Sequence, residues 1–121
     1  MLEWVEDVRN AIAADCVPDT RPVEISVVRI NDITIVCLPL ELYSEVGFDI
    51  RARLDDPSTV IAGYCNGICS YLASRKAKAQ GGYGPDTAVR WCAGALSPFS
   101  PDAAGILIDS VAKVTDACRR R

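Results

Sequence analysis

Two runs of β-branched residues follow one another with almost no gap between them. VEISVVRI occupies residues 23–30, ITIVCLPL occupies residues 33–40, and only an Asn-Asp pair separates them. Both turn residues tolerate a positive φ, so the spacing predicts a tight β-hairpin. The second run is almost wholly apolar as far as Leu38, which predicts a central strand covered on both faces. Pro39 ends it, because proline cannot donate a hydrogen bond to a strand ladder.

A helix and another strand are predicted after the hairpin. Residues 41–54 carry apolar side chains at i, i+4 spacing, which predicts an amphipathic helix. The stripe comprises Leu42, Val46, Ile50 and Leu54. TVIAGYC at residues 59–65 predicts a further strand, so residues 33–65 form a β-α-β unit. If its two strands share a sheet, they are expected to be parallel, with a right-handed crossover.

Further helices are predicted around this unit. Residues 2–14 have the pattern of an amphipathic helix, and Ser74 is placed to cap a short helix through Lys78 after an extended piece, ICSYLA. These elements alternate along the chain, which predicts an α/β fold in one domain, residues 1–121. Its expected parts are a mixed β-sheet with a β-hairpin, a β-α-β unit and flanking helices.

The C-terminal third is expected to begin irregularly and end in a helix. Residues 80–100 are rich in glycine and proline, which predicts an irregular surface segment. Ser100 and Pro101 are expected to open the last helix, as its N-cap and its first helical residue. The predicted buried face comprises Ala104, Leu107, Ile108, Val111, Val114 and Cys118.

Charge and hydropathy argue against several functional classes. The formal net charge is −3, and basic residues cluster only at Arg119–Arg121, a run expected to close a helix, so no nucleic-acid partner is expected. No stretch approaches the ~18 consecutive apolar residues of a transmembrane helix, so no such segment is expected. The N-terminus lacks the positive segment of a signal peptide. A cytoplasmic location is therefore favoured, or a secreted one if a leader or upstream part was removed.

The spacing of the six cysteines matches no recognisable disulfide framework or strong metal-binding motif. They are Cys16, Cys37, Cys65, Cys69, Cys92 and Cys118. Cys65 and Cys69 form a C-x3-C pair, which is a weak zinc motif. Most of the six lie among aliphatic residues, where a free cysteine behaves as a small hydrophobe. Reduced core thiols are expected, with disulfides or a cysteine-bound metal as the open alternatives.

Two polar side chains follow predicted strands, where ligands of α/β sheets bind. Glu41 comes after the second run, and Tyr71 comes shortly after the Asn66-Gly67 turn. Each also has a structural explanation: an acid in the first turn of a helix, and a half-buried strand tyrosine. Tyr83 among glycines is typical of a loop anchor. The chain has no histidine and therefore no Ser-His-Asp triad.

At these residues the chain resembles a known family. VVRINDITIVCLPLELYSEVGFDIRARL is similar to a segment of the neutral/alkaline (non-lysosomal) ceramidases, in which a strand runs into a Pro-Gly-Glu motif and then a helix. TVIAGYCNGICSYLAS is similar to the next strand of that family, which leads to an Asn and then a Tyr. GGYGPDT is similar to its Tyr-Gly-Pro loop. The resemblance spans roughly residues 23–117.

The resemblance implies a zinc-dependent amidohydrolase that cleaves the amide bond of N-acyl-sphingosine. By motif, Glu41 and Tyr71 would be zinc ligands, and Asn66, Gly67 and Tyr83 would belong to a substrate or structural loop. The other two ligands of the family are histidines, and they lie upstream with its catalytic serine. A catalytic zinc needs three or four protein ligands, so this chain would bind zinc only with a partner, such as a missing upstream domain or subunit.

Two departures from the family pattern weaken the expectation of activity. Leu40 stands where the family has glycine and is expected to crowd the turn beside the glutamate. Leu-Ala-Ser follows Tyr71 where a Thr pair is usual. The expectation is therefore a partial or split amidohydrolase for a lipid-like substrate, inactive without the upstream part.

Two other functions remain open. The chain could be a catalytically degenerate binding or oligomerising module, with self-association through an apolar patch left by the missing part. It could instead be a redox or metal protein that uses Cys37, Cys65 and Cys69.

Overall fold

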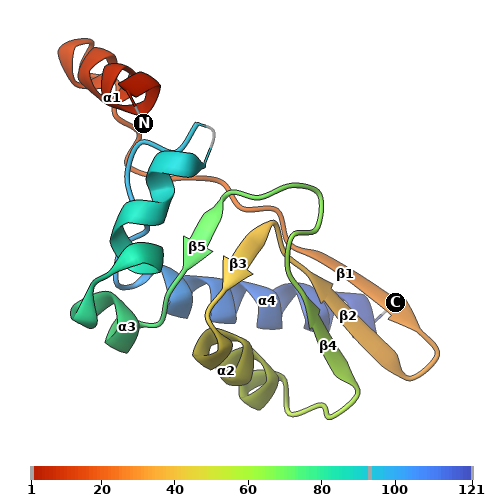
Figure 1. Cartoon of the computed structure of the whole chain (residues 1–121). Coiled ribbons are helices and arrows are strands. Elements are labelled where there is room, and N and C mark those ends of the chain that lie inside the picture. Colours follow the sequence, from red (N-terminus) through yellow and green to blue (C-terminus); the bar gives the residue numbers. More distant parts are fainter. Residues whose placement is uncertain (1, 93, 121) are drawn as a thin grey trace.

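The computed structural model describes residues 2–92 and 94–120 (Figure 1). The helices are α1 (Leu2–Ala13), α2 (Ser44–Leu54), α3 (Arg75–Gln80) and α4 (Ala103–Arg119). The strands are β1 (Ser26–Ile30), β2 (Ile33–Cys37), β3 (Leu40–Leu42), β4 (Thr59–Ala62) and β5 (Ser70–Leu72). A π-helical turn at Tyr83–Thr87 and a 3₁₀ turn at Ala88–Trp91 precede α4. The α/β fold predicted from the sequence is confirmed.

The main sheet has the order β1-β2-β4. The predicted hairpin is present, with β1 antiparallel to β2 and Ile30 opposite Ile33 across the turn. Asn31 has a φ of 53°, the left-handed conformation that this turn was expected to require. β2 and β4 are parallel, which makes the sheet mixed and confirms the β-α-β unit.

A second, two-stranded sheet was not predicted. β3 and β5 are parallel, and Leu40, Glu41 and Leu42 lie opposite Ser70, Tyr71 and Leu72. The predicted start of the helix at residue 41 is therefore wrong. Residues 40–42 are held extended by β5, and α2 begins only at Ser44, after an extended Tyr43.

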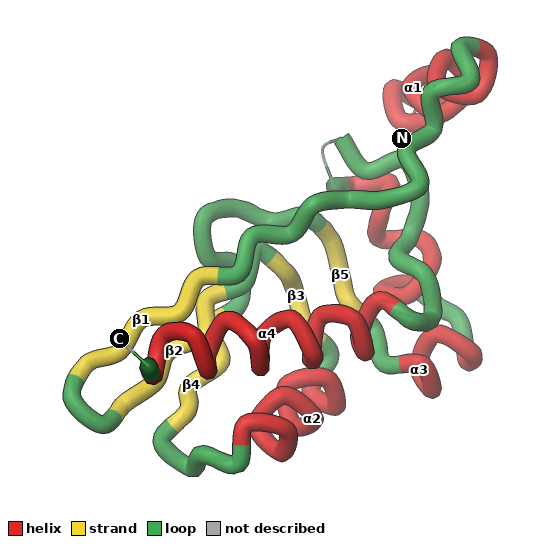
Figure 2. Tube along the Cα trace, turned by 180° about the vertical axis from the view of Figure 1, so that it is seen from behind, coloured by secondary structure: helices red, strands yellow, loops and turns green. Residues whose placement is uncertain are grey.

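Helices α2 and α4 cover one face of both sheets. α4 runs behind the strands in Figure 1 and in front of them in Figure 2, which is the opposite view. The core formed there includes Val36 and Leu38 of the β2 segment, Ile50 of α2 and Val111 of α4, all completely buried. Each such side chain contributes roughly 1.5–3 kcal/mol by leaving water.

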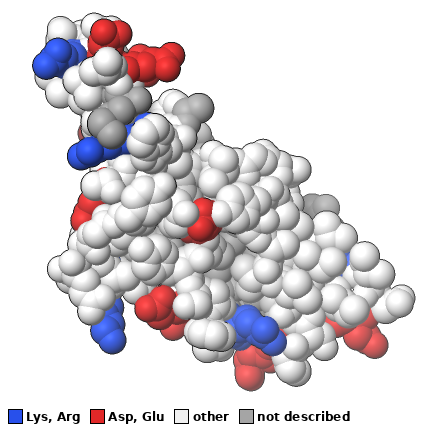
Figure 3. All heavy atoms as spheres, in the orientation of Figure 1, with Lys and Arg blue, Asp and Glu red and all other residues white. Residues whose placement is uncertain are grey.

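The opposite face of the main sheet is covered by no helix of the described residues. Val28, Ile35 and Val60 lie side by side there, since they are register partners across β1, β2 and β4. We call this surface the open face, and it comprises Val28, Ile30, Ile33, Ile35, Cys37, Val60 and Ala62. Ile33 is 48% exposed and Val60 49%. Figure 3 shows that few charged side chains lie on this side of the strands. The expectation that β2 is covered on both faces is therefore wrong.

The C-terminal segment differs from prediction in three details. α4 begins at Ala103 rather than at Pro101, because residues 101–102 form a turn in which the Ser100 carbonyl accepts the Ala103 N–H. Val114 is 36% exposed, and Thr115 is buried in its place. The irregular segment before α4 is also partly internal, with the side chains of Pro85, Ala88, Val89 and Ala95 buried.

The two ends of the chain have different surroundings. α1 forms as predicted but projects from the body of the molecule in both Figure 1 and Figure 2. The Trp4 indole N–H donates to the Ala95 carbonyl at 2.8 Å, which ties the helix to the body. At the other end, Arg119 closes α4 as expected, and Arg121 lies outside the described residues. Within residues 2–92 and 94–120, no helix is both long and apolar enough to cross a membrane.

Candidate functional site

Glu41 and Tyr71 are direct neighbours on the small β3–β5 sheet. They are register partners on parallel strands. Leu40 and Leu72, beside them in the chain, are buried in the core. Since successive side chains of a strand point to opposite faces, Glu41 and Tyr71 point away from the helices, to the same side as the open face. The two residues that the sequence singled out are thus brought together, both partly exposed.

Hydrogen bonding to the Glu41 carboxylate raises the pKa of the Tyr71 phenol to about 12. Partial burial of the phenol and the negative charge of Glu41 add to this effect. Tyr83 completes this part of the cluster, because its ring packs edge-on against that of Tyr71 with the centroids 5.8 Å apart. On this surface of the sheet, the Tyr71 phenol is therefore the proton donor and the Glu41 carboxylate is the acceptor.

Tyr64 is a further member of this cluster that the sequence analysis missed. Its pKa is also raised, first by a hydrogen bond to Glu41 and then by partial burial of the phenol. Tyr64 has a φ of 56°, and its backbone N–H donates to the Leu40 carbonyl at 3.3 Å. The sequence held one signal, because Tyr64 lies near the carboxyl end of the strand predicted at residues 59–65, and Glu41 follows another predicted strand. We call the cluster of Glu41, Tyr64, Tyr71 and Tyr83 the tyrosine–glutamate site.

Leu40 does not crowd Glu41, so that expectation is wrong. Its side chain is 1% exposed and packs into the core on the far side of the sheet from the carboxylate. The crowded position is Gly63 instead. A Cβ on Gly63 would lie 2.8 Å from the Leu40 carbonyl oxygen. Glycine at residue 63 lets the loop after β4 approach β3 closely enough to place Tyr64 beside Glu41.

Asn66 and Gly67 shape the loop between β4 and β5. Both have positive φ values, 59° and 120°, as the Asn-Gly pair predicts for a turn. The Asn66 amide donates to the Glu24 carboxylate at 3.4 Å, and both residues are exposed. The structure thus gives Asn66 a contact with the segment before β1 rather than one with Glu41.

The loop that carries Tyr83 is held by Lys78 and Asp86. The Lys78 ammonium group donates to the Pro85 carbonyl at 2.6 Å and to the Asp86 carboxylate at 3.1 Å. That contact with Lys78 is the main cause of a lowered Asp86 pKa. Asp86 also accepts the Gly82 N–H at 2.9 Å, which closes the loop from its other end. These contacts therefore hold the loop that places Tyr83 next to Tyr71.

The tyrosine–glutamate site offers oxygen donors only. Within residues 2–92 and 94–120, no three or more His, Cys, Asp and Glu side chains gather closely enough to hold a metal ion. A Glu carboxylate is a common zinc ligand, and a zinc site takes four ligands. The described side chains around Glu41 therefore do not make a complete zinc site.

The cysteines are all free. Cys37 lies next to Cys65, and its pKa is raised by burial, then by a hydrogen bond with the Cys65 thiol. Cys69 packs against the hydrophobic core, and its backbone N–H donates to the Pro39 carbonyl. Of the three cysteines that a redox function would use, Cys37 and Cys65 are therefore neighbours, and Cys69 packs separately against the core.

Comparisons of this chain with protein-family models, with curated proteins and with solved structures find no match.

Proposed function

We propose that this chain supplies half of a zinc amidohydrolase site, in which Glu41 and Tyr71 are two of the metal ligands. The observation that carries the proposal is the pairing of these two side chains, in register, on one exposed surface. The remaining ligands would come from a partner, either an upstream domain or a separate subunit. The N-acyl, lipid-like substrate rests on the resemblance to ceramidases alone.

A cation bound between the two oxygens would change the protonation of Tyr71. Without one, the negative carboxylate keeps the Tyr71 phenol protonated, with a pKa of about 12. A bound divalent cation would oppose this effect, because it favours the deprotonated form of a ligand. Bound zinc would supply Lewis-acid polarisation of an amide carbonyl and a more acidic water.

The other residues of the site have supporting roles in this proposal. Contact with Glu41 raises the pKa of Tyr64, and the same contact would fix the orientation of the carboxylate, as partners of metal ligands commonly do. Tyr83 would hold the Tyr71 ring through their edge-on contact.

The open face supports the need for a partner. It is apolar and lies on the same side of the strands as the tyrosine–glutamate site, so one partner could cover both. Large contiguous apolar surfaces on a protein mark interaction sites. A cytoplasmic location is part of the proposal, since a reducing compartment suits six free thiols.

Zinc titration by calorimetry, with imidazole added, tests the proposal. Imidazole supplies the nitrogen ligands that the chain lacks. We expect it to strengthen zinc binding, and Glu41→Gln or Tyr71→Phe to weaken that binding by about tenfold or more, the order expected for loss of a charge-assisted contact. An ultraviolet difference spectrum should show tyrosinate forming as zinc binds. Glu45→Gln, an exposed acid in the first turn of α2, is the matched control.

The same titration includes the cysteine alternative. Zinc held by Cys37 and Cys65 would be lost in Cys37→Ser and retained in Glu41→Gln. That result, or tyrosine spectra unchanged by zinc, would contradict the proposal.

A second candidate is a binding or oligomerising module without catalysis. The exposed apolar side chains of the open face favour it directly, since they call for a covering surface whether or not a metal binds. A chain that associates through this face yet binds no zinc at Glu41, even with imidazole, would have this function instead.

A further inference from the structure

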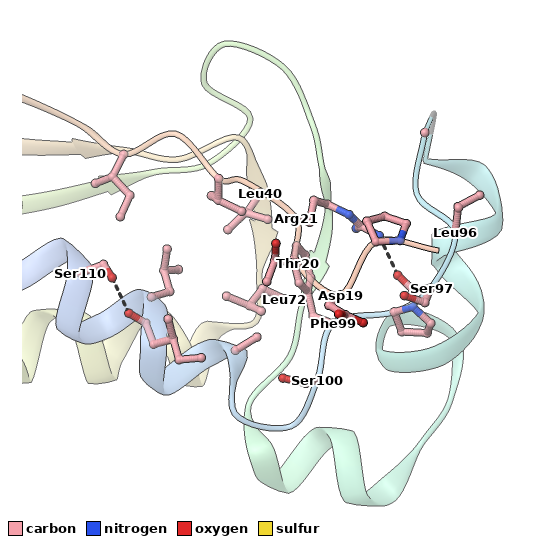
Figure 4. Close-up of a pocket in the computed structure, with 18 residues that line it drawn as sticks. Asp19, Thr20, Arg21, Leu40, Leu72, Leu96, Ser97, Phe99, Ser100 and Ser110 are labelled. Atoms are coloured by element: carbon pink, nitrogen blue, oxygen red, sulfur yellow. Dashed lines mark hydrogen bonds between the residues drawn. The ribbon is translucent and has the colours of Figure 1, made fainter. Parts of the chain in front are cut away.

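A cavity lies on the helix side of the small sheet, away from the tyrosine–glutamate site. Its volume is about 430 Å³. That is within the range of roughly 300–1,000 Å³ that small-molecule pockets occupy. It is enclosed by the segment before β1, strands β3 and β5, the loop before α4, and α4 itself (Figure 4).

The walls of the cavity are mostly apolar. They include Val23, Ile25, Leu40, Leu72, Phe99 and Leu107. Leu40 and Leu72 line it from the same strands that carry Glu41 and Tyr71 on their other face. Figure 4 shows that the cavity extends from Arg21 and Ser97 at one end to Ser110 of α4 at the other. An extended apolar chain would fit such a shape.

Arg21 brings a positive charge to one end of this cavity. One nitrogen of its guanidinium group, Nη2, donates to the Ser97 carbonyl at 2.7 Å. The group also lies over the Phe99 ring, with its central carbon 4.8 Å from the centroid. The other terminal nitrogen, Nη1, is buried and has no hydrogen-bond partner among the described residues. The Arg21 side chain as a whole is only partly buried, so a ligand would meet the guanidinium group at its more exposed part.

Asp19 does not neutralise the charge of Arg21. It lines the cavity, but it is exposed and forms no ion pair with Arg21 among the described residues. Its negative charge opposes an anionic ligand modestly, since it is screened by water. The cation at this end of the cavity is therefore not neutralised by an ion pair with a described carboxylate.

We infer that this cavity binds an alkyl monocarboxylate, with its head group at the guanidinium group of Arg21 and its chain along the apolar walls toward Ser110. A carboxylate oxygen is a strong acceptor for a guanidinium N–H. The alkyl chain would gain by leaving water against leucine, isoleucine and phenylalanine side chains. This site goes beyond the proposed zinc site, because it lies on the other face of the strands and shares no side chain with it.

Calorimetric titration of the whole chain with decanoate, below its micelle concentration, tests the inference. One molecule should bind per chain. Decanol and decylamine have the same chain and should bind more weakly by about tenfold or more, since each lacks the charge that the guanidinium group attracts. Arg21→Met should cause a loss of similar size. Asp19→Asn should strengthen decanoate binding.

A second variant keeps the test independent of any folding defect in Arg21→Met. Ser110 is half-buried on α4, so Ser110→Leu would fill the far end of the cavity without disturbing the core. It should weaken dodecanoate binding more than hexanoate binding. Equal affinities for decanoate and decanol, no saturable decanoate binding, or unchanged binding in Arg21→Met with its fold intact would each overturn the inference.

Discussion

Gly63 approaches Leu40 so closely that a Cβ at residue 63 would lie 2.8 Å from the Leu40 carbonyl oxygen. This contact brings the loop after β4 against β3, and it sets Tyr64 beside Glu41. Since the obstructing atom belongs to the backbone of a paired strand, it cannot move aside easily. The close approach of the loop after β4 to strand β3 therefore depends on the absence of a side chain at residue 63.

Gly63→Ala should lower the free energy of unfolding by about 1–3 kcal/mol, the usual cost of inserting a methyl group into a filled space. Urea unfolding measures it. Gly47→Ala is the matched control, because a Cβ there meets nothing within 4 Å and residue 47 lies inside α2. It should be neutral or raise stability by up to about 1 kcal/mol. Equal stability of the two variants would contradict the role assigned to Gly63.

Glu41→Gln should lower the pKa of Tyr71 from about 12 toward the ordinary value of 10.0, because the carboxylate is the main cause of the shift. Spectrophotometric titration of tyrosinate gives the measurement, and Tyr71→Phe identifies the component. Glu45→Gln should leave that component in place. A Tyr71 that titrates near its ordinary pKa in the wild type would contradict the pairing.

The same shift predicts how stability changes with pH. The folded pKa of Tyr71 is above the unfolded value, so the folded state holds its proton more tightly. The resulting stability is fully present below pH 10 and is lost as pH rises through about 12. Melting temperatures measured across this range should fall less steeply in Glu41→Gln than in the wild type. If the melting temperatures of the two proteins fell equally steeply with pH, this prediction would be contradicted.

Oxidised glutathione should link Cys37 to Cys65. One thiolate attacks glutathione disulfide and releases one glutathione, and the neighbouring thiol then attacks the mixed disulfide and releases a second. The raised pKa of Cys37 should make the reaction slow at neutral pH and faster in alkali. Peptide mapping by mass spectrometry detects the link. Stable glutathione adducts on both residues, without a link, would show that the thiols cannot meet.

The open face should make the chain associate at high concentration. Val60, 49% exposed, lies on this face, and Val60→Lys should shift the chain toward monomer by placing a charge in the contact. Phe48→Lys is the control, since Phe48 is 67% exposed but lies on α2. Sedimentation velocity over a range of concentrations distinguishes them. A wild-type chain that remains strictly monomeric would refute this prediction.

Local patterns were sufficient to predict the hairpin and the β-α-β unit. Each is determined by neighbouring residues, such as the Asn-Asp turn and the stripe that buries Val46 and Ile50. The β3–β5 sheet escaped prediction because strands of three residues carry almost no periodic signal. Their pairing joins residues about thirty positions apart, which is a tertiary effect.

The candidate sites divide in the same way. Glu41 and Tyr71 were identified from motifs, and their contact then followed from strand pairing. Tyr64 was missed because its place beside Glu41 depends on the close approach of Gly63. Nothing in the sequence indicated that Nη1 of Arg21 would be buried without a hydrogen-bond partner among residues 2–92 and 94–120, since burial of one nitrogen depends on distant elements packing around it. The open face was missed because an apolar run looks the same whether one or both of its faces are covered.

The one-sided helical layer has a consequence for how this fold tolerates change. Along β2, the side chains of Thr34 and Val36 are buried in the core, and those of Ile33 and Ile35, which alternate with them, lie on the open face. Substitutions at the buried residues should therefore change the stability of the fold. Substitutions at the open-face residues should change what the surface binds. A library varied only at the open-face residues would sample new binding surfaces on an unchanged scaffold.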